Sequence, residues 1–181
     1  MTTTTIESVG DQITTLLSLF KLPTAAVQLV RRMMDAGHQD ALSTVHEVLC
    51  LEQEDRQERR VDRLRRASKL PPGKTFDTFD DTPLPRTLAS KLREFATGKF
   101  VEEAINVLAF GLPGTGKTHA ASALGHALVE AGHPVLFAPT FKLVQDLLAA
   151  KRDLELPRAL RKLDSFSVLI LDSCAAPAYV Q

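Results

Sequence analysis

The chain has 181 residues with equal numbers of basic and acidic side chains, 22 of each, which excludes a general electrostatic attraction to polyanions. A hydrophobic fraction of 44% allows one globular domain with an appendage, and the two distant cysteines, Cys50 and Cys174, exclude a disulfide framework and a cysteine metal site. No apolar run approaches about 20 residues and no signal-peptide pattern begins the chain, so we expect a cytoplasmic protein with no membrane partner.

The first part of the chain shows only helical patterns. Apolar side chains recur at helical spacing in residues 12–20, and residues 23–37 begin with proline and end with glycine, as helices commonly do. A long helix is predicted over residues 40–69. These patterns predict an all-helical N-terminal region, residues 1–70, which is the candidate region for binding DNA or a protein partner.

The end of this long helix carries an excess of positive charge. Only two carboxylates, Glu58 and Asp62, accompany seven cations: Arg56, Arg59, Arg60, Arg63, Arg65, Arg66 and Lys69. Such a stretch either neutralises DNA phosphates or forms a solvated helix surface with internal ion pairs. The excess of cations favours DNA, whereas the neutrality of the whole chain opposes it. Four of these side chains are the candidate DNA-binding residues: Arg59, Arg60, Arg63 and Arg66.

A linker is predicted at residues 71–85, where two prolines and a glycine interrupt the helical pattern. Phe76 and Phe79 lie in this linker, upstream of a glycine-rich loop. They either line an adenine pocket or pack the entry to the following domain. That domain is expected over residues 86–181 and begins with a predicted helix over residues 86–98.

The second domain contains a phosphate-binding loop. Eight residues fill every position of the pattern G-x-x-x-x-G-K-[ST]: Gly111, Leu112, Pro113, Gly114, Thr115, Gly116, Lys117 and Thr118. Glycines let the backbone curl with its N–H groups around an anion, and the following helix directs its positive end to the same place. Lys117 supplies a charge for the β- and γ-phosphates, and the Thr118 hydroxyl is a ligand for Mg²⁺. The loop therefore predicts a nucleoside triphosphate and Mg²⁺ as cofactors.

Strand and helix patterns surround this loop. Residues 104–110 are apolar and β-rich, which predicts a buried parallel strand, and residues 117–132 are rich in Ala and Leu, which predicts a helix. A second strand is predicted at residues 133–139, helical structure with a proline break at residues 140–165, and a third strand at residues 167–172. This alternation predicts an α/β fold with a parallel sheet.

Asp172 ends the third predicted strand. An acidic residue in this position, downstream of a phosphate loop, is the Walker B arrangement and holds Mg²⁺ directly or through water. The alternative is a strand-end aspartate that caps a turn. The loop upstream favours the metal, so Thr118 and Asp172 are the predicted Mg²⁺ ligands.

At this point the sequence resembles a known family. FGLPGTGKTHAASALGHALVEAGHPVLFAPTFKLVQDLLAAKRD, residues 110–153, and FSVLILD, residues 166–172, resemble the IstB-like ATPases. These are helper proteins of insertion sequences and relatives of the DnaC helicase loader. ERRVDRLRRASKLPPGKTFDTFD, residues 58–80, also looks similar. The GKTH continuation together with the helical front end is more specific than the phosphate loop alone.

The resemblance implies an AAA+ P-loop ATPase with a parallel sheet core, preceded by the helical N-terminal region. Such proteins form homo-oligomers on duplex DNA, bind ATP between neighbouring subunits and direct a partner transposase, or in the loader branch act on a replicative helicase. The residues that match the family's phosphate and Mg²⁺ positions are Gly114, Gly116, Lys117, Thr118 and Asp172.

The residues after Asp172 depart from the family pattern. The family has a second acid directly after this aspartate, where the chain has Ser173, and a serine cannot act as a base near neutral pH. The family's polar sensor, arginine finger and helical lid are also missing. We therefore expect a truncated form that binds ATP and does not hydrolyse it, and we assign no catalytic residue.

The sheet that the resemblance implies also lacks one strand in this sequence. The AAA+ strand order, 5-1-4-3-2, places a fourth strand between the first and the third, and the chain shows no fourth strand. Two alternatives stay open. One is a non-hydrolysing DNA- or helicase-binding module of the DnaC helicase-loader type. The other is a complete small P-loop kinase or GTPase, although neither a guanine-specifying N-K-x-D nor an Arg-rich lid supports it.

Overall fold

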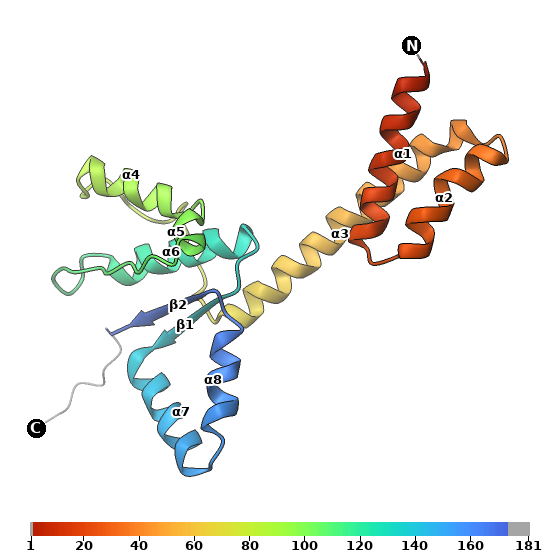
Figure 1. The fold of residues 1–181 in the computed structure, drawn as a ribbon. Coiled ribbons are helices and arrows are strands. Elements are labelled where there is room, and N and C mark those ends of the chain that lie inside the picture. The colour runs from red at the N-terminus through yellow and green to blue at the C-terminus, as the bar shows by residue number, and fades with distance from the viewer. Residues whose placement is uncertain (1, 174–181) are drawn as a thin grey trace, which may run out of the picture. The chain divides into compact units, whose positions relative to one another are not determined.

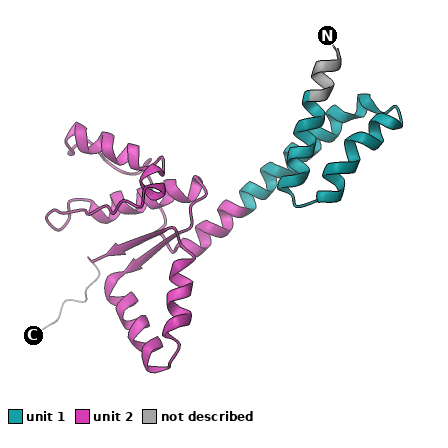
Figure 2. Cartoon of the chain, viewed as in Figure 1, with its two compact units in different colours: residues 1–59 teal, residues 60–181 magenta. Residues whose placement is uncertain are grey.

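The computed structural model describes residues 2–173, and side chains from residue 8 onward. Cys174 and the rest of the C-terminal segment, residues 174–181, lie outside the described residues. The chain divides into two compact units, residues 1–59 and residues 60–181 (Figure 2). Within residues 2–173, no helix combines the length and the apolar character needed to cross a membrane.

The first unit is helical, as predicted. Its elements are α1 (Thr2–Leu19), α2 (Pro23–Asp35), the short 3-10 helix η1 (Gln39–Ala41) and the first part of α3 (Leu42–Ser68). The apolar side chains spaced along α1 and α2 meet the start of α3 in one core. Its buried members are Ile13, Leu17, Ala26 and Leu42.

A glycine inside α1 lets α2 approach closely. A Cβ placed on Gly10 would lie 3.1 Å from the Val30 Cγ1 atom. Glycine inside a helix costs about 1 kcal/mol relative to alanine. Glycine at position 10 has this cost, but its missing side chain lets α1 and α2 pack closely. The two helices share extensive contacts.

The boundary between the units falls inside α3, at residues 59 and 60, instead of after residue 70 as the domain prediction had it. The physical reason is the core of the second unit. Val61 and Leu70 are buried in that core, and Leu64 packs against it. The last turns of α3 therefore belong to the second unit, and helical periodicity alone cannot show to which core a helix end contributes.

The second unit is an α/β structure. Its elements are α4 (Arg86–Phe95), α5 (Lys99–Glu102), α6 (Lys117–Glu130), β1 (Val135–Pro139), α7 (Thr140–Arg152), α8 (Leu156–Asp164) and β2 (Val168–Asp172). The two strands pair in parallel, with Val135 opposite Val168 and Pro139 opposite Asp172. Helix α6 lies on one side of this sheet, and α7 and α8 lie on the other (Figure 1).

The core of this unit lies between α6 and β1. Leu128, Val129 and Val135 are completely buried there, and the other buried members of the cluster are Val61, Leu70, Leu124 and Phe137. Strands β1 and β2 are the second and third strands predicted from the sequence. Their pairing agrees with the expected order 5-1-4-3-2, in which strands 2 and 3 are neighbours.

The strand prediction for residues 104–110 is wrong in this structure. The segment has no strand assignment, and its apolar side chains are exposed, with Leu108 76% and Phe110 87% accessible. A strand needs the ladder hydrogen bonds of a neighbour, and both strands of the described sheet pair only with each other. Apolar and β-branched residues therefore do not suffice to make this segment a strand.

Residues 105–108 and β2 nevertheless line one cleft of about 560 Å³, together with Leu124 and Leu128 of α6. The expected strand order places one more strand between these two segments. The cleft lies at that position.

Gly125 of α6 is closely packed, which yields a stability prediction. A Cβ on Gly125 would lie 2.6 Å from Leu70 Cδ2 and 2.7 Å from Ile170 Cδ1. We expect Gly125→Leu to lower the free energy of unfolding by about 1–3 kcal/mol, the usual cost of overpacking a core. Thermal unfolding followed by circular dichroism measures the effect.

Ser90→Leu, at an exposed position of α4, is the matched control and should leave the melting temperature nearly unchanged. Equal melting temperatures for Gly125→Leu and the unsubstituted chain would show that α6 does not pack against β2 as described.

Candidate nucleotide-binding site

The glycine-rich loop enters α6 through left-handed backbone conformations. Gly114 has φ 79° and Gly116 has φ 82°, and Gly116 is the residue that precedes the first turn of α6. Side chains with a Cβ are strained in this region, which is why glycine is required at these two places. The loop therefore leads directly into a helix N-terminus, where unpaired N–H groups favour an anion.

Lys117 lies over the start of the loop. Its Nζ donates hydrogen bonds to the carbonyl oxygens of Gly111, at 2.9 Å, and Leu112, at 2.7 Å. The Thr115 hydroxyl donates to the same Leu112 oxygen, at 2.8 Å. The lysine charge is thus held within the curve of the loop, close to the N-terminal end of α6.

Thr118 and Asp172 meet, although 54 residues separate them in sequence. The Thr118 hydroxyl donates a hydrogen bond to Asp172 Oδ1 at 3.2 Å. Thr118 lies in the first turn of α6, and Asp172 is the last residue of β2. The structure thus brings the two predicted Mg²⁺ ligands together at the mouth of the phosphate loop.

These two oxygen atoms fit Mg²⁺. The ion prefers oxygen ligands at about 2.1 Å in octahedral geometry, in which neighbouring ligands lie about 3 Å apart. The observed separation is 3.2 Å. Among the described residues, no group of three His, Cys, Asp or Glu side chains is arranged to hold a metal ion. Such a Mg²⁺ ion would therefore depend on phosphate oxygens and water for its other ligands.

The two linker phenylalanines have different roles in the fold. Phe76 packs against the core of the second unit, as one of the two predicted alternatives had it. Phe79 instead lies beside the loop, where its Cε2 atom would be 3.6 Å from a Cβ on Gly116. Only Phe79 is therefore placed to contact a nucleotide held by the loop.

His119 was not singled out by the sequence analysis, although it belongs to the GKTH motif. Its Nε2 lies 3.2 Å from the Thr78 hydroxyl and 3.3 Å from the Thr75 carbonyl oxygen. Its ring packs edge-to-face against Phe79, with 5.2 Å between ring centroids. His119 thus fixes the linker segment, and Phe79 with it, against the start of α6.

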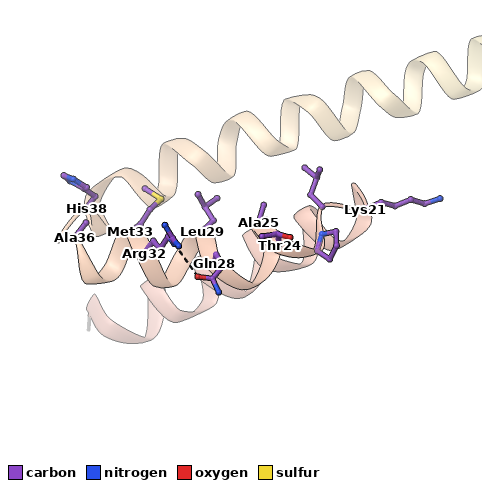
Figure 3. Close-up of a pocket in the computed structure, with 11 residues that line it drawn as sticks. Lys21, Thr24, Ala25, Gln28, Leu29, Arg32, Met33, Ala36 and His38 are labelled. Carbon is purple, nitrogen blue, oxygen red and sulfur yellow. Dashed lines mark hydrogen bonds between the residues drawn. The ribbon is translucent and has the colours of Figure 1, made fainter.

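A groove of about 590 Å³ in the first unit does not resemble this site. It follows α2 and is lined by apolar side chains, among them Leu29 and Met33, with Lys21, Arg32 and His38 also lining it (Figure 3). It has no glycine-rich loop and no carboxylate. It is therefore not a second Mg²⁺–nucleotide site.

The candidate DNA-binding arginines differ in their surroundings. Arg59 forms an ion pair with Asp55 at 2.6 Å, and this hydrogen bond raises the pKa of Arg59. Arg60 donates to the Gly132 carbonyl oxygen at 3.2 Å. Within the described part of the chain, Arg63 and Arg66 form no ion pair closer than 4.0 Å. Arg59 thus has the ion pair that a solvated helix surface is expected to form, whereas Arg63 and Arg66 are exposed without one.

Comparison with known proteins identifies the family. The sequence pattern of the family described as IstB-like ATP binding protein matches residues 13–178. The match includes most of the helical first unit, the phosphate loop and Asp172.

Several proteins of insertion sequences are similar to the chain. One named as an insertion sequence ATP-binding protein, from Sinorhizobium fredii, is 43% identical over 122 residues, which are 67% of this chain and 41% of the relative. The ATP-binding protein named for insertion sequence IS21 in Pseudomonas aeruginosa is 43% identical over 130 residues, 70% of this chain and 49% of the relative. A protein of this kind from Mycobacterium tuberculosis is 35% identical over 141 residues, 78% and 55% of the two chains.

The matches therefore cover about half the length of these relatives. The family pattern covers most of the present chain, and the loop geometry agrees with it. The chain belongs to the family of IstB-like ATP binding proteins.

Proposed function

We propose that the chain binds Mg²⁺–ATP as a helper protein of DNA transposition. The observation that carries the nucleotide site is the contact between Thr118 and Asp172 at the end of the phosphate loop. The names of the relatives, which are ATP-binding proteins of insertion sequences, support ATP as the nucleotide.

Each part of the site has a distinct role in this proposal. The loop N–H groups and the N-terminus of α6 hold the phosphates, and Lys117 neutralises the β- and γ-phosphate charge. Thr118 and Asp172 hold Mg²⁺, which shields the phosphate charge when bound. Phe79, fixed by His119, lines the adenine side of the site.

Binding in this proposal does not lead to hydrolysis. Cleavage requires a water molecule positioned at the γ-phosphate, usually by a general base. Asp172 is already engaged with Thr118, and the next residue, Ser173, cannot accept a proton near neutral pH. Loss of a general base typically lowers a rate by about 10²–10⁴-fold.

We further propose that the first residues of the second unit contact duplex DNA. Arg63 and Arg66 carry this role, because Arg59 and Arg60 are engaged with other groups of the protein. In an insertion-sequence context the protein partner is a transposase, the protein acts in the cytoplasm, and neighbouring copies assemble as a homo-oligomer. The helicase-loader alternative is less favoured, since the similar proteins are named for insertion sequences.

The first prediction from the proposed function concerns nucleotide affinity. Lys117→Ala removes the charge that pairs with the phosphates, so we expect the affinity for Mg²⁺–ATP to fall at least about tenfold. Isothermal titration calorimetry measures both proteins. Lys151→Ala, at an exposed position at the end of α7, is the control and should bind as the unsubstituted chain does. Equal affinities for Lys117→Ala and the unsubstituted chain would refute the loop as the nucleotide site.

The second prediction concerns turnover. Because Ser173 offers no base, phosphate release by this chain should equal that of Lys117→Ala, with or without duplex DNA. A steady-state phosphate assay with Lys117→Ala as the blank measures this. Turnover of about one per minute or faster, within the range of slow enzymes and absent from the blank, would contradict the proposed loss of hydrolysis.

The third prediction concerns DNA. Each cation that neutralises a phosphate adds about 0.9 to the slope of log affinity against log salt. Replacing both Arg63 and Arg66 with Gln should therefore lower this slope by up to about 2. Fluorescence anisotropy with a labelled duplex at several salt concentrations measures it.

Arg59→Gln is the matched control, because Arg59 is already paired with Asp55. It should change the slope by less than either Arg63→Gln or Arg66→Gln. A slope that is the same in the double variant and in the unsubstituted chain would show that DNA contacts other residues or does not bind.

A further inference from the structure

A second groove lies in the α/β unit, away from the phosphate loop. It has a volume of about 740 Å³, and the end of α3, β1, α7 and α8 form its walls. Helices α7 and α8 lie on the side of the sheet opposite α6 (Figure 1). The phosphate loop precedes α6, and none of its residues lines the groove.

The floor of this groove is apolar. Strand β1, helices α7 and α8 and the segment that follows α8 supply it with Leu136, Phe137, Leu143, Leu147, Leu163 and Phe166. Leu136 and Phe137 are nearly buried, and the other four side chains are partly accessible. A partly accessible apolar floor gains free energy when a partner removes it from water.

The rim of the groove is positively charged. Four cations line it, Arg66, Lys69, Lys142 and Lys162, against one carboxylate, Asp146. All four cations are exposed, and in the described part of the chain none of them forms an ion pair within 4.0 Å. Arg65, in the same unit, does form an ion pair, with Glu130 at 2.7 Å. The lining of the groove therefore carries a net positive charge.

We propose that this groove is a docking site for an acidic amphipathic helix of a protein partner. The apolar face of such a helix would cover the floor, and its acidic residues would meet the four cations of the rim. This is the helix-in-groove mode of recognition, in which apolar anchors supply affinity and charges supply orientation and specificity.

The apolar floor favours a protein over nucleic acid. A DNA backbone is satisfied by cations and hydrogen-bond donors, and it gains little from a floor of leucine and phenylalanine. The proposal is independent of nucleotide binding, but the groove shares Arg66 with the proposed DNA contact. Its test therefore uses Lys142 and Lys162, which belong neither to the nucleotide site nor to the proposed DNA contact.

The experiment measures binding of designed peptides to the full chain. The probe is a fluorescein-labelled helical peptide of 18 residues with leucines on one face and glutamates on the other. Two control peptides replace the leucines with serine or the glutamates with lysine. Fluorescence anisotropy at physiological salt gives the affinities.

Charge-reversed variants locate the site. Lys142→Glu combined with Lys162→Glu should weaken binding of the acidic peptide at least about tenfold, because two attractive contacts become repulsive. The matched control combines Lys99→Glu with Lys151→Glu, exposed lysines that do not line the groove, and should bind the peptide as the unsubstituted chain does. Far-UV circular dichroism confirms that both variants keep their helices.

Three results would overturn the proposal. The acidic peptide does not bind the unsubstituted chain, it binds as well with serine in place of leucine, or both double variants weaken it equally. A labelled DNA duplex that loses affinity on reversal of Lys142 and Lys162, while the peptide does not bind, would identify the groove as a DNA site instead. The proposal is supported if both control peptides bind more weakly than the acidic peptide. In addition, binding of the acidic peptide should weaken only in the variant that combines Lys142→Glu with Lys162→Glu.

Discussion

The close packing of α6 against β2 is the constraint on which the rest of the second unit depends. Gly125 permits it, because any larger residue would meet Leu70 and Ile170. Two helical turns before Gly125, Thr118 stands at the start of α6, and two residues after Ile170, Asp172 ends β2. The packing of one helix on one strand thus sets the distance between the two oxygen atoms that form the predicted metal site.

Binding and hydrolysis separate in the proposed function because they require different groups. Holding a triphosphate requires backbone N–H groups, a lysine and oxygen ligands for Mg²⁺, and the loop, Thr118 and Asp172 supply these. Hydrolysis requires in addition a group that orients and deprotonates water. The neighbouring position has a serine, so the geometry that favours binding does not by itself provide turnover.

The glycine-rich loop and the long helices could be predicted from sequence, because each depends on local periodicity or on a motif of fixed spacing. The pairing of β1 with β2 was expected instead from the AAA+ strand order that the family resemblance implies. The structure of residues 104–110, where a strand was expected, could not be predicted, since a strand exists only with a paired neighbour and apolar composition does not report pairing. The part played by His119 was missed for a similar reason. Its contacts with Thr75 and Thr78 join segments more than 40 residues apart.

The central claim is that Thr118 and Asp172 act together on the Mg²⁺ of a bound nucleotide. A double-mutant cycle of Thr118→Ala and Asp172→Asn, with Mg²⁺–ATP affinity measured by calorimetry, tests it most directly. If both side chains hold one ion, each substitution weakens binding, and the double variant is little weaker than the more damaged single variant. Losses that simply add, or affinities that do not depend on Mg²⁺ in any of the four proteins, would contradict a shared metal site.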